Sequence, residues 1–163
     1  HRDDATWKSV DQLILLLVDT VSHGGNLLLN VGPTGRGEFD ERALDRLAGI
    51  GEWMKRHGRA IYGCTQAPED FKAPQDCRLT YNPTTNRIYV HIFNWPIQVL
   101  HLDGFAGRVE YAQLLNDASE VKFQQRDPYQ ASVEGLAPDT LTLHLPVIKP
   151  KVSVPVVELF LNR

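Results

Sequence analysis

The run Asn-Leu-Leu-Leu-Asn-Val at residues 26–31 constrains the fold of this chain more than any other feature. The run is too short for a helix, it does not alternate between apolar and polar residues, and Gly25 and Gly32 bound it. Such a run is typical of a strand that is buried on both faces, as in parallel sheets covered by helices. The sequence therefore predicts a doubly buried strand over residues 27–31.

An amphipathic helix is predicted on either side of this run. Ser9 and Gln12 form a capping-box pattern, and the following apolar residues recur at helical spacing up to the glycine pair that begins at Gly24. After the loop at residues 32–37, Asp40 is placed to cap a second helix that ends near Gly58. The apolar stripes of the two helices consist of Val10, Leu13, Ile14, Leu17, Val18 and Val21 in the first and Leu44, Leu47, Ile50, Gly51 and Met54 in the second.

Helix, strand and helix in this order make one unit of an alternating α/β fold, yet no later segment supplies a parallel neighbour. At roughly 25 cal/mol per Å² of apolar area, leaving three leucines in water costs several kcal/mol. We therefore expect the missing strands N-terminal to His1, where the chain also begins without a methionine. The alternative is that residues 27–31 join the later sheets as an irregular strand. If these leucines were exposed to solvent, only a similarity to known sequence motifs would support the α/β assignment.

From about residue 64 onward the hydrophobic period is two, which is typical of an antiparallel β-sandwich. The sequence thus divides into an α/β segment at residues 1–63 and an all-β domain at residues 64–163. A turn at residues 82–86 predicts a hairpin, and no helix is expected in this half. The predicted strands are 77–81, 87–93, 98–102, 108–115, 120–125, 140–145 and 155–161, with a weaker candidate at 129–133.

Charge and composition exclude several function classes. The net charge is −3 and no basic stripe is present, so nucleic acid is not an expected partner. The longest aliphatic run, residues 13–18, is far below the roughly 20 residues that span a membrane. Cys64 and Cys77 either pair across a short loop or remain free thiols, and no zinc-ligand spacing accompanies them. No cofactor and no metal site are therefore predicted.

Residues 17–34 (LVDTVSHGGNLLLNVGPT) resemble the closing segment of the catalytic barrel in the α-L-fucosidases of glycoside hydrolase family 29. Further similar segments are residues 7–9, 35–37, 50–54 and 58–63. The resemblance implies the last strand and helices of a (β/α)8-like barrel, incomplete in this chain, followed by a C-terminal antiparallel β-sandwich. It also implies a retaining, exo-acting enzyme that releases terminal α-L-fucose from glycoconjugates.

Retaining glycosidases use two carboxyl groups about 5 to 5.5 Å apart. The resemblance implies that the Asp nucleophile and the acid/base carboxylate both precede His1, so the isolated chain is expected to be inactive. Its implied partners are a fucosylated glycan and the remainder of the barrel, and a homo-oligomer is compatible with the family. Secreted, periplasmic, lysosomal and cytoplasmic locations all fit the family.

Barrel enzymes place their sites at the C-terminal ends of the strands, which in this chain is the region of Asn30, Gly32 and Pro33. We predict that these three residues form or support the rim of the substrate pocket. Asn30 either points its amide toward the pocket or braces a neighbouring strand. Leu28→Asp is predicted to unfold the helical half, because it would bury an unpaired charge.

Other polar and aromatic residues are interpreted as structural. They are Asp19, His23, Glu38, Asp40, Trp53, His91, Trp95, His101 and His144. Two alternatives to a hydrolase segment stay open: a carbohydrate-binding or structural β-sandwich module without hydrolase activity, and a separately expressed subunit that docks onto the rest of a barrel.

Overall fold

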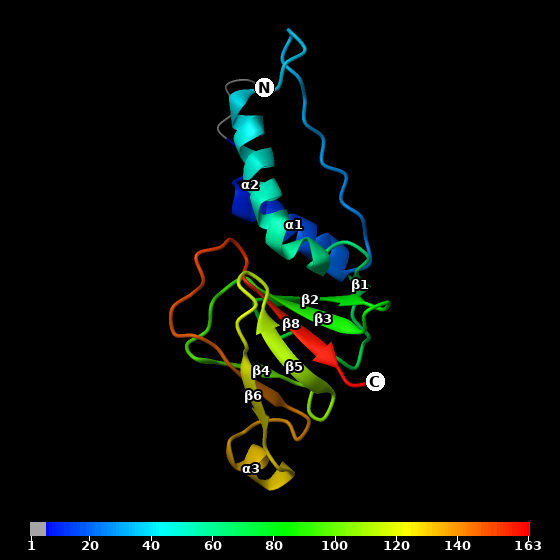
Figure 1. Ribbon diagram of the computed structural model, residues 1–163, viewed down its shortest axis with the longest axis vertical. Helices are drawn as coiled ribbons and strands as arrows, with labels where there is room; N and C mark the ends of the chain where they lie inside the picture. The colour runs from blue at the N-terminus through cyan, green and yellow to red at the C-terminus, as the bar shows by residue number, and fades with distance from the viewer. Residues whose placement is uncertain (1–5) are drawn as a thin grey trace.

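The computed structural model of the protein describes residues 6–163. Two antiparallel sheets form a β-sandwich in the middle of an elongated molecule (Figure 1). Helices α1 and α2 lie at one end, and the short helix α3 lies at the other (Figure 1). The two halves of the sequence, helical and strand-rich, therefore occupy separate regions of space.

The long helices begin where their capping residues predict. Helix α1 spans Val10–Ser22, and Ser9 and Gln12 form the reciprocal capping box, with the Ser9 hydroxyl accepting from the Gln12 amide at 3.2 Å. Helix α2 spans Glu41–His57, and the Asp40 carboxylate accepts from the Arg42 amide at 2.9 Å. Gly58 follows α2 in a right-handed conformation and leads into the 3-10 helix η1, Gly58–Ala60.

The close packing of α1 against α2 depends on Gly49. A Cβ atom at this position would lie 2.6 Å from Val10 Cγ2, which is closer than carbon atoms pack. A larger residue would therefore push the two helices apart.

The seven main strand predictions are confirmed. The larger sheet has the order β1-β2-β3-β8-β5 and the smaller one β4-β7-β6, with all neighbours antiparallel. The predicted hairpin is the β2–β3 pair, whose turn is held by the Asn82 side chain accepting from the amides of Thr84 and Thr85. The strands are β1 Thr65–Gln66, β2 Cys77–Asn82, β3 Arg87–Ile92, β4 Val99–Leu102, β5 Val109–Leu114, β6 Lys122–Gln125, β7 Leu141–His144 and β8 Val156–Leu161.

The weaker strand candidate at residues 129–133 is wrong, because this segment forms helix α3, Pro128–Val133. The Asp127 carboxylate accepts from the amides of Tyr129 and Gln130, and Pro128 occupies the first turn, where its missing N–H costs nothing. The Asp-Pro helix start at residues 127–128 thus determines the conformation of this segment, and the short alternation of apolar residues does not.

The predicted strand at residues 27–31 is also wrong for this chain, since the segment carries neither helix nor strand. Leu28 is 84% exposed, and Leu29 is exposed as well. Neither sheet in the described part of the chain includes the run, so the alternative in which it joins the sandwich is not observed. A strand exists only when hydrogen-bonded to a neighbour, and the family assignment therefore needs support other than burial.

The larger sheet separates two hydrophobic cores. One face packs on the smaller sheet, through residues such as Val90, Leu143 and Leu159. The opposite face carries Tyr89 and Val156 and packs on α1 and α2. Trp53 of α2 is buried in this second core, as predicted.

Candidate functional site

The three predicted site residues lie on the long connection between α1 and α2. After Gly24 the chain runs beside the helices toward the far end of the molecule and turns back into α2 (Figure 1). The turn is closed by an antiparallel bridge between Pro33 and Phe39 and by a hydrogen bond from the Thr34 amide to the Glu38 carbonyl at 2.7 Å. Gly37 has a φ of 80°, which glycine adopts at little cost.

Two adjoining grooves, which share Trp7 and Gly32, flank this connection. The smaller, of about 270 Å³, is lined in part by Asn30 and Gly32 and by the apolar Leu13, Leu29 and Ala43. The larger, of about 920 Å³, is lined in part by Gly32, Pro33, Arg36 and Glu38. The structure thus brings Asn30, Gly32 and Pro33 together at one edge of the helical unit, and their role at a substrate pocket stays a prediction.

Trp7, Arg42 and Arg46 are groove residues for which the sequence pattern gave no functional signal. The guanidinium carbons of Arg42 and Arg46 lie 4.5 and 5.6 Å from the centroid of the Trp7 ring. The Arg46 Nε atom also donates to the Lys8 carbonyl at 3.1 Å. These contacts fix the segment before α1 against α2. The one available signal was the i, i+4 spacing of the two arginines, which also occurs on ordinary solvated helix faces.

The carboxylates at the larger groove do not form a catalytic pair. Asp40 caps α2 and forms a two-pronged pair with the Arg42 guanidinium, with distances of 2.9 and 3.1 Å. Glu38 lies in the exposed loop before it. This arrangement can bind and orient a polar ligand, but it contains no nucleophile held by a base.

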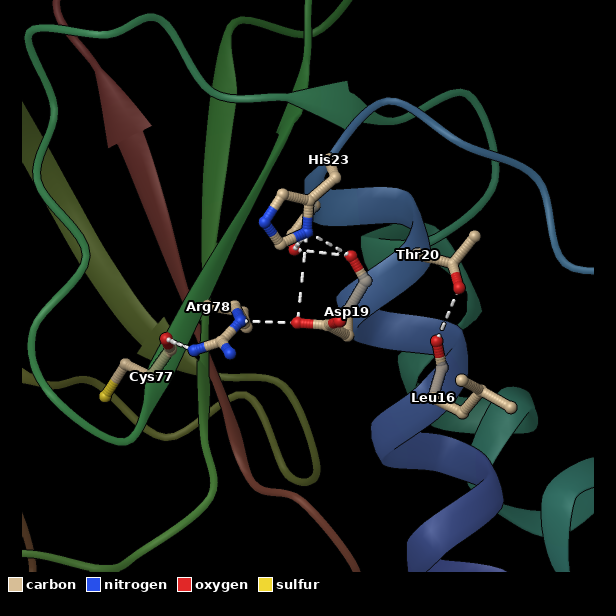
Figure 2. Close-up of polar contacts among 7 residues, drawn as sticks. Leu16, Asp19, Thr20, His23, Cys77 and Arg78 are labelled. Carbon is tan, nitrogen blue, oxygen red and sulfur yellow. Dashed lines mark hydrogen bonds and ion pairs between the residues drawn. The ribbon is translucent and has the colours of Figure 1, made fainter.

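An ion pair connects α1 to the sandwich. Figure 2 shows the Asp19 carboxylate reaching the Arg78 Nε atom of β2, at 2.7 Å. The exposed His23 caps the end of α1, and its Nδ1 lies 2.7 Å from the Asp19 carbonyl (Figure 2). Asp19 and His23 are therefore structural residues, as predicted.

A second and more deeply buried cluster surrounds Glu158 of β8, whose side chain is fully buried. Arg59 of η1 and Arg87 of β3 lie 2.9 and 3.0 Å from its two oxygens. Tyr89 and Gln113 also donate to the carboxylate, at 3.2 and 2.6 Å. Because Arg59 follows α2, this cluster ties the helical unit to the centre of the larger sheet.

Two buried histidines lie at the same interface. Burial lowers the pKa of His57, and burial together with the nearby His57 lowers the pKa of His91 to about 3. The Trp53 ring stacks on His57 at 4.8 Å, and His91 Nε2 lies 2.9 Å from the Thr80 hydroxyl. At neutral pH both rings are therefore neutral, which fits a structural role.

The remaining predicted structural residues take no part in the grooves. Cys64 and Cys77 are free thiols, and burial raises their pKa values to about 11 and about 12, which makes them poor nucleophiles. Trp95 packs against the sandwich core and donates from Nε1 to the Pro146 carbonyl at 3.0 Å. His101 and His144 lie on neighbouring strands of the smaller sheet.

Residues 6–163 contain neither a cluster of metal ligands nor a helix that could span a membrane. No group of three or more His, Cys, Asp and Glu side chains within this range could hold a metal ion. None of the helices described there combines the length and the apolar character that crossing a bilayer requires.

Comparisons with known proteins identify the relatives of this chain. The family profile described as Alpha-L-fucosidase matches residues 1–59, which include both helices and all three predicted rim residues. The structure of α-L-fucosidase isoenzyme 1 from Paenibacillus thiaminolyticus superposes on 100% of this chain with a TM-score of 0.86 and 36% identity. The chain is similar to the α-L-fucosidases of glycoside hydrolase family 29.

The likeness to α-L-fucosidases extends through both halves of the chain. The α-L-fucosidase of Dictyostelium discoideum is 30% identical over 156 residues, which cover 94% of this chain. The α-L-fucosidase of Branchiostoma floridae is 35% identical over 95 residues, or 56% of the chain. The matched parts make up 37%, 32% and 20% of the Paenibacillus, Dictyostelium and Branchiostoma proteins, respectively. The chain thus spans about a third or less of the length of the Dictyostelium and Branchiostoma proteins.

Proposed function

We propose that this chain is the C-terminal part of a retaining, exo-acting α-L-fucosidase that hydrolyses terminal α-L-fucose from glycoconjugates. The observation that carries the proposal is the superposition of the entire chain, helices and sandwich together, on an α-L-fucosidase at 36% identity. A carbohydrate-binding or structural module without hydrolase activity would account for the sandwich, but not for the helical unit matched by the family profile.

In this proposal, residues 27–31 become the last strand of a (β/α)8-like barrel when the remaining barrel strands lie beside them. Helices α1 and α2 precede and follow the segment, as helices do in a barrel. Its exposed leucines would then be buried, and each leucine side chain removed from water contributes about 2 kcal/mol. The part at residues 1–63 would complete the barrel, and the part at residues 64–163 would support it from outside.

The chemistry is assigned to carboxylates outside this chain. The acids at the larger groove are the N-cap Asp40, which is paired with Arg42, the loop residue Glu38 and Glu41 in the first turn of α2. We therefore assign the Asp nucleophile and the acid/base to the proposed remainder of the barrel. The retaining mechanism is supported by a relative from Bacteroides thetaiotaomicron, whose covalent intermediate was trapped with 2-fluoro-fucosyl fluoride. In the complete site, Asn30, Gly32 and Pro33 form or support the pocket rim.

Complementation tests this proposal. The 163-residue chain is co-expressed with the Paenibacillus α-L-fucosidase truncated before the region that matches this chain, and hydrolysis of 4-nitrophenyl α-L-fucoside is measured. The chain alone is expected to show no turnover, whereas the pair is expected to restore it. Proton NMR of the first product is expected to show the α-anomer of fucose, as retention requires.

Two equally exposed apolar residues supply a matched pair of variants. Leu28 lies on the proposed barrel strand and Ile148 on a sandwich loop, and they are 84% and 81% exposed in this chain. Leu28→Asp is expected to abolish complementation, because the charge would be buried on assembly, whereas Ile148→Asp is expected to preserve it. Turnover by the chain alone, or equal complementation by the two variants, would contradict the proposal.

A further inference from the structure

The end of the sandwich opposite the long helices carries a groove of its own. It has a volume of about 460 Å³ and is lined by residues of β6, of α3 and of their connection. Figure 1 shows α3 at the lower end of the molecule, below β6. The groove is lined by Gln124, Gln125, Arg126, Tyr129, Gln130, Val133 and Glu134. A volume of this size accommodates a small organic ligand.

The wall of this groove is held in a fixed shape. The Arg126 Nε atom donates to both Glu134 oxygens at 3.0 Å, which fastens the end of α3 to the end of β6. At the start of α3, the Asp127 carboxylate caps the amides of Tyr129 and Gln130. The two charged side chains of the wall therefore neutralise each other, and they leave no net charge for an ionic ligand.

The uncharged side chains of the groove are available to a ligand. Tyr129 and Val133 lie one helical turn apart on α3, and they are 79% and 72% exposed. The backbone amides of Tyr129 and Gln130 are capped by Asp127. Within residues 6–163, by contrast, no side chain is hydrogen-bonded to the Tyr129 hydroxyl or to the side-chain amide of Gln130. Gln125 uses its oxygen to accept from the Gly107 amide at 2.5 Å, so its NH₂ group remains a donor.

We propose that this groove binds a neutral saccharide, with the Tyr129 ring stacked on the apolar face of one sugar and the glutamine amides paired with its hydroxyl groups. An aromatic ring beside amides that both donate and accept matches sugar chemistry, in which C–H faces alternate with hydroxyls. The mutual neutralisation of Arg126 and Glu134 disfavours sulfated and sialylated glycans. The site lies on the sandwich alone, so this inference does not rest on the proposed hydrolase function.

The test is a titration of the 15N-labelled 163-residue chain with lactose, N-acetyllactosamine and 2′-fucosyllactose, followed by amide NMR. At least one sugar is expected to bind with a millimolar dissociation constant and to shift the amide signals of residues 122–134 selectively. Tyr129→Ala is expected to weaken binding about tenfold, which corresponds to about 1.4 kcal/mol for the lost ring stacking. The matched control is Tyr62→Ala, which removes a tyrosine of similar exposure (72%) from the helical end and is expected to leave binding unchanged.

Gln130→Ala provides a second variant that removes an amide without changing the aromatic ring, and it is also expected to weaken binding. The proposal is overturned if none of the three sugars shifts the signals of residues 122–134. It is equally overturned if the shifts persist unchanged in both Tyr129→Ala and Gln130→Ala. Because no hydrolysis is measured, a negative result here says nothing about complementation of fucosidase activity, and the two proposals fail independently.

Discussion

Lowering the pH is expected to destabilise the protein through His91. The ring is completely buried between the larger sheet and α2. Its centroid lies 6.4 Å from the centroid of the Trp53 ring, and its Nε2 atom is hydrogen-bonded to the Thr80 hydroxyl. Burial and the neighbouring His57 lower the pKa of His91 from 6.5 to about 3. Between these two values the unfolded chain binds a proton that the folded chain does not, so the free energy of unfolding falls as the pH falls.

The size of this effect follows from the linkage between protonation and folding. One proton bound only by the unfolded chain changes the free energy of unfolding by about 1.4 kcal/mol per pH unit. Because the unfolded ring is half protonated at pH 6.5, lowering the pH from about 6.5 to about 4.5 should remove about 2 kcal/mol through His91 alone. That is a large part of the roughly 5–15 kcal/mol that stabilises a typical protein. His57 contributes in the same direction, because burial also lowers its pKa.

Carboxylates contribute mainly at lower pH. Hydrogen bonds from Arg108 and from Ser119 lower the pKa values of Asp70 and Asp117 below the usual range of an aspartate. A carboxyl whose folded pKa is lowered keeps its contribution above its unfolded pKa and loses it as the pH falls further. The range between about pH 6.5 and pH 4.5 therefore reports mainly on the buried histidines.

Urea unfolding followed by tryptophan fluorescence at several pH values measures this slope, and Trp53 reports directly from the interface. His91→Gln, which keeps an amide for Thr80 but does not titrate, is expected to reduce the slope by about one proton equivalent. His144→Gln, which makes the same substitution at an exposed histidine on β7, away from the buried interface, serves as the control. A free energy of unfolding that stays constant over this range, or an equal slope in wild type and His91→Gln, would refute the reasoning.

Three further predictions concern stability. Because Leu28 is exposed, Leu28→Asp should leave the melting temperature of the isolated chain nearly unchanged, which is contrary to the sequence-based prediction. A drop of several degrees in a thermal melt would contradict the exposed position of Leu28. Gly104→Ala should strongly destabilise the protein, because the added Cβ would collide with the Asp70 carbonyl oxygen. Gly107→Ala should cost only about 1 kcal/mol of backbone strain, because the space around Gly107 is open. Equal losses of unfolding free energy in urea titrations would contradict this difference. Glu158→Gln should cost about 2 kcal/mol, because the fully buried carboxylate that pairs with the partly exposed Arg59 and Arg87 loses its charge. Glu134→Gln, at a more exposed pair, should cost at most about 1 kcal/mol, and similar unfolding midpoints would argue against the buried cluster.

Residues close together in the sequence determined much of the local structure. Ser9 and Asp40 satisfy amides of their own helices, and Asn82 holds its own hairpin turn, so these starts and turns require no distant partner. Alternation with period two likewise placed the seven main strands. The helix α3 could have been predicted in the same way from Asp127 and Pro128, because its signal is also local.

Only the tertiary structure decided which side chains are buried and what they contact. The leucines of residues 27–31 have the composition of a core strand, yet Leu28 and Leu29 are exposed. A strand needs a hydrogen-bonded neighbour, and the run by itself does not specify that neighbour. Glu158 looks like an ordinary acid in the sequence, yet strand order places it among Arg59, Arg87 and Gln113, which are far away along the chain. Burial and pairing between distant residues depend on how the elements pack, and this is the information that a single sequence does not contain.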